Sequence, residues 1–132
     1  IIVSRGYSQV LINEKGGSTV KLNGDVAFAY NGVTSGTPID ANVLINLDSP
    51  DSYWNGNAQA MGSAPAGYDQ VTGMELGLSN RAQWTTDETG FLNTLRVNNG
   101  VVNVVGGESQ VVTIDSVEGN GGDINLTATT DC

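Results

Sequence analysis

The sequence contains no histidine, and its single cysteine, Cys132, is the last of 132 residues. Without histidine there is no Ser-His-Asp or Cys-His catalysis and no histidine-ligated metal site. A single cysteine excludes an internal disulfide, and a thiol at a chain end without a partner base is poorly placed to act as a nucleophile. These absences exclude much of the chemistry on which small enzymes and small metal-binding domains depend.

Positive charge is also scarce, because five Lys and Arg residues face fourteen Asp and Glu residues, for a net charge of −9. Nucleic acids and anionic membrane surfaces are bound by clustered Lys and Arg, so both partners are disfavoured. The glycine-rich segments 106–110 and 119–123 lack the lysine and the following helix of a phosphate-binding loop. The simple explanation of the acidity is that it favours solubility and repulsion between copies. The more specific alternative is adaptation to a saline or calcium-rich habitat.

The length predicts one domain, residues 1–132, which is large enough to bury roughly two thirds of its unfolded surface. No long apolar run or signal peptide is present in the sequence. The chain begins Ile1-Ile2-Val3, and methionine removal of the bacterial type requires a small second residue. This start therefore favours a processed precursor or a numbering that begins inside a longer chain.

Apolar residues recur with a period of two along most of the sequence, which predicts an all-β protein. Turn formers at residues 23–24, 98–100 and 119–122 each predict a hairpin, with a bulge in one long strand as the alternative at the first position. Only residues 57–64 resemble a short helix, and no repeat of fixed period is visible. About eight to ten short strands predict a β-sandwich, either Ig-like or a jelly-roll-like Greek key.

Residues Gln83–Ile114 resemble the second half of bacterial immunoglobulin-like repeats. Such repeats run from a Trp through Ser/Thr and Asp/Asn residues to an alternating strand, an Asn-Gly turn, a Val-rich strand and a last strand. The resemblance implies an Ig-like sandwich that acts as a spacer or binding module in surface adhesins or phage virion proteins, without catalytic residues. It also implies that Trp84 is a buried core residue. The matching residues are Trp84, Thr85, Thr86, Val97, Asn99, Gly100, Val101, Gly107 and Ile114.

The segment Asp48–Gln70 is predicted to be one long irregular loop, and it carries Tyr53, Trp54 and Tyr68. Large aromatic residues dominate protein–protein hot spots and sugar-stacking platforms, so these three are the candidate contacts with a partner or ligand. The alternative is that the aromatic residues only anchor the loop to the core. A partner subunit is favoured over a sugar, because no groove of carboxylates and amides is evident.

Two acidic features of the sequence offer groups for catalysis or metal binding. Glu75 lies among apolar residues in a predicted strand, where alternation directs its side chain to solvent. Asp48, Asp51, Asn55 and Asn57 offer oxygen ligands for calcium, and residues 121–126 resemble half of a calcium-binding nonapeptide repeat. Asp and Asn are also ordinary turn formers, and that interpretation is favoured. We therefore expect no catalytic residues, no metal and no cofactor.

Together these observations predict a non-enzymatic structural protein, a β-sandwich subunit or decoration domain of a virion or another extracellular multi-copy assembly. Its expected partners are other copies of itself or a neighbouring shell or filament subunit, with neither nucleic acid nor membrane insertion. The alternative is a carbohydrate-binding module or adhesin domain of a larger secreted protein, in which a carbohydrate is the ligand.

Overall fold

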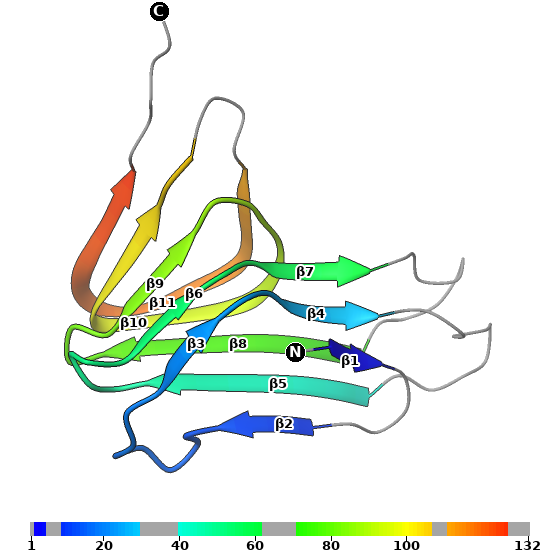
Figure 1. Ribbon diagram of the computed structural model, residues 1–132, viewed down its shortest axis with the longest axis horizontal. Coiled ribbons are helices and arrows are strands. Elements are labelled where there is room, and N and C mark those ends of the chain that lie inside the picture. Colours follow the sequence, from blue (N-terminus) through cyan, green and yellow to red (C-terminus); the bar gives the residue numbers. More distant parts are fainter. Residues whose placement is uncertain (1, 5–8, 30–39, 62–70, 107–110, 127–132) are drawn as a thin grey trace, which may run out of the picture.

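The computed structural model describes residues 2–4, 9–29, 40–61, 71–106 and 111–126, and its regular elements in these ranges are all β-strands (Figure 1). The predicted all-β character is confirmed. The eleven strands are β1 (Ile2–Ser4), β2 (Gln9–Ile12), β3 (Lys21–Asn23), β4 (Val26–Ala29), β5 (Asp40–Leu47), β6 (Tyr53–Asn55), β7 (Ala58–Met61), β8 (Val71–Ser79), β9 (Gln83–Thr86), β10 (Thr89–Val104) and β11 (Val112–Leu126).

Each of the first six strands pairs in parallel with the strand that comes three places later in the chain. The pairing β1-β4-β7 forms one sheet, and β2-β5-β8-β10-β9-β6-β3 forms a strongly bent, half-barrel sheet with β11 on the outer side of β10. Every third strand is thus a neighbour, so the chain winds in stacked coils. The first three coils consist of three strands each, namely β1–β3, β4–β6 and β7–β9. The fourth and fifth coils each consist of one long bent strand, β10 and β11. This winding is that of a parallel β-solenoid.

The predicted β-sandwich is therefore wrong, because the sheets are parallel rather than antiparallel. The three predicted hairpins are corners between coil faces. Residues 23–24 lead from β3 into β4, which belongs to the other sheet, and Gly24 has a φ of 121°. Residues 98–100 and 119–122 lie inside β10 and β11, whose partners continue in parallel past them. A residue that tolerates positive φ turns the chain through a solenoid corner as readily as through a hairpin.

The stacked coils contain an imperfect repeat whose period is not fixed. Leu22 pairs with Trp54 and Trp54 with Trp84, spacings of 32 and 30 residues. The three positions begin related tetrapeptides, Leu-Asn-Gly-Asp, Trp-Asn-Gly-Asn and Trp-Thr-Thr-Asp. The repeat then shortens, since Trp84 pairs with Val102 after 18 residues. Three imperfect copies followed by shorter coils do not give the fixed period that identifies a solenoid from sequence.

The core lies between the two sheets, and strand alternation fills it. Met74, Leu76 and Leu78 are buried, as the alternation in β8 predicts, while Glu75 between them lies on the outer face. Trp84 is fully buried, which confirms the prediction for that residue. The buried cluster comprises Val26, Val43, Ile45, Leu47, Trp54, Ala58, Met74, Leu76, Leu78, Ala82, Trp84, Leu92, Leu95, Val97 and Val102.

Candidate functional site

The segment predicted to be an irregular loop is largely strand in its first half. Residues 53–55 form β6, and residues 58–61, expected to be nearly helical, form β7. Trp54 is fully buried and stacks on Trp84, with ring centroids 5.4 Å apart and planes inclined by 14°. Its indole Nε1 donates a hydrogen bond to the Gly24 carbonyl at 2.8 Å. Trp54 is thus a core residue, which corrects its assignment as a contact with a partner or ligand.

The other two aromatic candidates have different positions. Tyr53 is half-buried on the outer face of β6, in line with Lys21 on β3 and Gln83 on β9. Tyr68 lies outside the described residues. Of the two described candidates, Trp54 lies in the core and Tyr53 on the outer face, so the structure does not bring these two side chains together into one surface.

Asp48 and Asn57, two of the four residues that the sequence offers as calcium ligands, use their oxygen atoms to hold turns and corners. Asp48 accepts hydrogen bonds from the Asn13 amide at 3.1 Å and from the Gly17 backbone N–H at 2.8 Å. The Asn57 amide donates to Asp87 at 2.7 Å, and its oxygen accepts from the Thr86 hydroxyl at 2.7 Å. In the described parts of the chain, no three His, Cys, Asp or Glu residues are grouped so that they could hold a metal ion.

A shallow hollow of about 270 Å³ lies at this Asn57 corner. Asp25 accepts from the Asn57 backbone N–H at 2.9 Å, and Asn57 also accepts from the backbone N–H groups of Asp87 and Glu88. These bonds connect successive coils where the chain leaves the half-barrel sheet. The polar groups here stabilise the corner, as buried and half-buried amides in parallel stacks commonly do. The lining comprises Asp25, Asn55, Gly56, Asn57, Thr85, Thr86, Asp87 and Val105.

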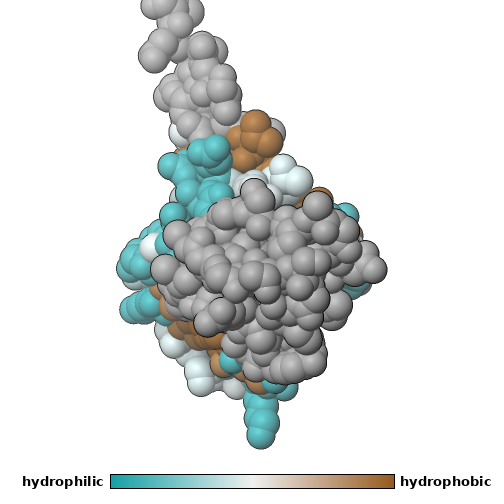
Figure 2. Space-filling view, turned by 90° about the vertical axis from the view of Figure 1, so that its right-hand side faces the viewer, coloured by the Kyte–Doolittle hydropathy of each residue, from teal (hydrophilic) through white to brown (hydrophobic). Residues whose placement is uncertain are grey.

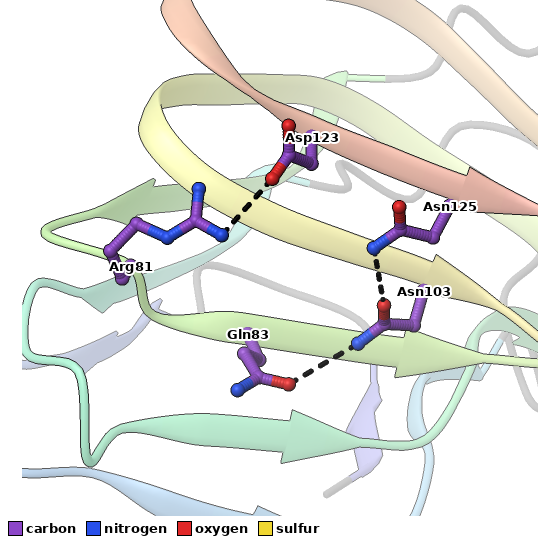
Figure 3. Close-up of polar contacts among 5 residues, drawn as sticks. All are labelled: Arg81, Gln83, Asn103, Asp123 and Asn125. Carbon is purple, nitrogen blue, oxygen red and sulfur yellow. Dashed lines mark hydrogen bonds and ion pairs between the residues drawn. The ribbon is translucent and has the colours of Figure 1, made fainter.

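Side-chain amides form a ladder across the outer face of the half-barrel sheet (Figure 3). Asn125 on β11 donates to Asn103 on β10 at 2.9 Å, and Asn103 donates to Gln83 on β9 at 3.3 Å. Arg81 and Asp123 form an ion pair at 3.0 Å beside it. Asn103 and Asn125 are directly paired in the β10–β11 register, and their side chains are hydrogen-bonded as well. The last strand is therefore bonded to the stack by its side chains as well as by its backbone.

Glu75 pairs with Arg96 at 2.9 Å, and Glu118 lies 3.4 Å from the same guanidinium. The hydrogen bond and charge of Glu75, with a smaller effect of Glu118, raise the pKa of Arg96 above its usual range. A raised arginine pKa adds stability that is present below the unfolded pKa and lost only above it, so Arg96 itself introduces no pH dependence near neutrality. The pair is an exposed surface ion pair.

We expect Glu75→Gln to lower the free energy of unfolding by no more than about 1 kcal/mol, because both side chains are over a third exposed and water screens the pair. Urea denaturation at pH 7 measures this change, with Asp51→Asn as an exposed acidic control. A loss well above that range would show that Glu75 has a role in the fold beyond this pair.

The most unusual surface is the outer side of β11, the last strand of the stack. Among the described residues β11 pairs only with β10, so one edge of a 15-residue strand has no backbone partner. Val117 and Ile124 project from it with 57% and 61% of their surface exposed. We call this edge, with Val117 and Ile124, the open end.

Both residues of the open end stand in core positions of the solenoid. Val117 continues the row of Ile45, Leu76 and Leu95, which are at most 1% exposed. Ile124 continues the row of Trp54, Trp84 and Val102, which are at most 2% exposed. The side chains are exposed because no described strand lies above them.

A hollow of about 250 Å³ lies against this surface, lined by Val97, Val117, Glu118, Gly119, Gly121, Gly122 and Ile124. Figure 2, which views the molecule from the right-hand side of Figure 1, shows a small apolar patch beside hydrophilic residues near the top. The sequence does not reveal this surface, because the turn formers at residues 119–122 predict a closed hairpin. A signal was present, since Val117 and Ile124 are spaced seven residues apart, as are Leu95 and Val102 in the preceding coil.

Comparison with known proteins gives no relatives. No family model matches the chain, and neither a curated protein nor a solved structure is significantly similar to it. No helix in the described ranges has the length and apolar character needed to cross a membrane.

Proposed function

We propose that this protein is a non-enzymatic structural protein that works in many copies, as a subunit or decoration domain of a virion or another extracellular assembly. The open end is the observation that supports this most strongly. It is a contact surface rather than a pocket for chemistry, and it would join the protein to other copies of itself or to a neighbouring subunit.

An uncovered strand edge is unfavourable for a protein that stays alone in solution. A long strand with free N–H and C=O groups is a template for pairing with another chain, and protein edges are usually shortened, charged, bulged or covered. Here the uncovered edge carries two large aliphatic side chains in core positions, where solenoids ordinarily end in a polar cap. A partner strand would pair the backbone and remove both side chains from water.

The rest of the described surface supports a structural role. Its polar groups are engaged in ladders and corners that link one coil to the next, such as the Asn125–Asn103 and Asn57–Asp87 hydrogen bonds. Such repeated links between coils suit a rigid element that positions an interface.

The proposal predicts that the protein associates with rising concentration and that Val117→Lys abolishes this. A charged side chain at the centre of the contact loses apolar burial and desolvates an ammonium group, so we expect association to weaken at least about a hundredfold. Sedimentation velocity over a wide concentration range measures the effect.

Pro50→Lys is the matched control, because it adds the same charge at an exposed turn position of the second coil, outside the amide ladder, and should leave association unchanged. Circular dichroism should show intact strand structure in both variants. A wild-type chain that stays monomeric at every concentration and binds no neighbouring subunit would refute the proposal, as would equal association of wild type and Val117→Lys.

A further inference from the structure

The structure also indicates what covers the open end, an inference that rests on the proposed function. We infer that the first coil of a second copy, β1 to β3, stacks on β11 and continues the solenoid head to tail. In the half-barrel sheet, β2 and β3 are the two terminal strands of the pairing order, so the first coil presents the opposite edge of the same stack.

The apolar rows continue in register across this contact. Ile12 begins the row that ends at Val117, and Leu22 begins the row that ends at Ile124. Ile12 and Leu22 are only partly buried, although they pack against the core. Stacking a second copy places its Ile12 on Val117 and its Leu22 on Ile124. The exposed side chains at the two ends then bury each other, and each apolar row continues from one copy into the next.

The charges at the two ends are complementary. Both lysines of the chain, Lys15 and Lys21, lie in the first coil and are exposed. The described part of β11 carries Asp115, Glu118 and Asp123 and no base. Lys21 begins the row of Tyr53, Gln83 and Val101 that ends at Asp123, so head-to-tail stacking sets a lysine directly beside this aspartate.

The same features argue against pairing of two open ends with each other. Two copies related by a twofold axis would bring six carboxylates onto one contact, and because Asp123 and Glu118 are already paired with Arg81 and Arg96 of their own chain, β11 gains no new ion pair from such a contact. The two β11 strands would also pair antiparallel, so the rows of apolar side chains that run through the parallel coils would not continue across the contact. A head-to-tail contact is heterologous and does not close on itself, so it builds a filament.

Disulfide trapping tests the register directly. In a Cys132→Ser background, Lys21→Cys and Asp123→Cys are made as two separate proteins, both altered only at exposed positions. Directly paired residues of adjacent strands lie ~4.8 Å apart, within the range of a disulfide. We expect oxidation of the mixture to give a disulfide-linked 1:1 heterodimer that a reductant reverses, while each protein alone gives no disulfide-linked dimer.

Asn125→Cys is the register control, because it lies two residues further along β11, ~8 Å from Lys21→Cys across the contact and outside disulfide range. It should give at least tenfold less heterodimer. Lys21→Glu in the otherwise unchanged chain should weaken association about tenfold at low salt and less at high salt.

The outcomes separate this inference from the proposed function. If Asp123→Cys alone forms homodimers, two open ends pair and the head-to-tail inference is wrong, while the structural role stands. If Val117→Lys abolishes association but the cysteine mixture gives no heterodimer, a different surface or protein covers β11, and the inference again is wrong. If the wild-type chain does not associate but binds a neighbouring subunit, only the head-to-tail inference is wrong; if it does neither, both fail.

Discussion

We expect Trp84→Ala to lower the free energy of unfolding by about 3–5 kcal/mol, the usual cost of removing a buried aromatic side chain. Trp84 is fully buried, and its ring stacks on that of Trp54 on the neighbouring strand of the half-barrel sheet. Its Nε1 also donates to the Gly56 carbonyl at 3.0 Å, so the change leaves a part-buried acceptor without its partner. A loss of this size is a large share of the stability of a small domain.

Chemical denaturation monitored by circular dichroism measures this loss, because the mutation removes one of two fluorescent tryptophans. Trp84→Phe keeps much of the apolar volume and should cost distinctly less. A double-mutant cycle with Trp54→Phe gives the coupling between the rings, expected at about 0.5–1.5 kcal/mol. A wild-type Trp84 that iodide quenches freely, or a Trp84→Ala variant of unchanged stability, would contradict the buried stack.

The sequence predicts the strands better than it predicts their partners. Alternation in β8 identifies Met74, Leu76 and Leu78 as inward-facing, because the side-chain period of a strand depends only on its own backbone. Pairing depends on where the chain goes after each turn. Residues 98–100 resemble a hairpin turn, yet they bend a strand whose neighbours run parallel on both sides.

The candidate site shows the same limit. An adjacent Tyr-Trp pair in a segment rich in turn formers predicts an exposed loop, but the sequence does not show that Trp54 stands one coil below Trp84. Val117 and Ile124 resemble interior residues of any strand. Their exposure follows from the position of β11 at the end of the stack, which is a property of the whole fold.

Gly56→Ala should destabilise the protein by about 3 kcal/mol or more, since a Cβ there would overlap backbone rather than a movable side chain. Gly56 lies at the corner between β6 and β7, directly above the Gly24 corner of the preceding coil. A Cβ at this position would collide with the Gly24 carbonyl and lie 2.8 Å from the Trp54 Nε1. That carbonyl accepts the Trp54 hydrogen bond, so the coils must separate at the tryptophan stack to make room.

Gly90→Ala is the matched control for this change. Neither Gly56 nor Gly90 has a positive φ, so an alanine strains neither backbone, and the two positions differ only in the space available. The nearest atom to a Cβ on Gly90 is the Gln59 Oε1 at 3.6 Å, an ordinary contact at the end of a flexible side chain. We expect Gly90→Ala to change the free energy of unfolding by less than about 0.5 kcal/mol. Equal stability of the two variants in urea denaturation would mean that the coils at residues 24 and 56 are not in close contact, and the stacked register of the first three coils would then be wrong.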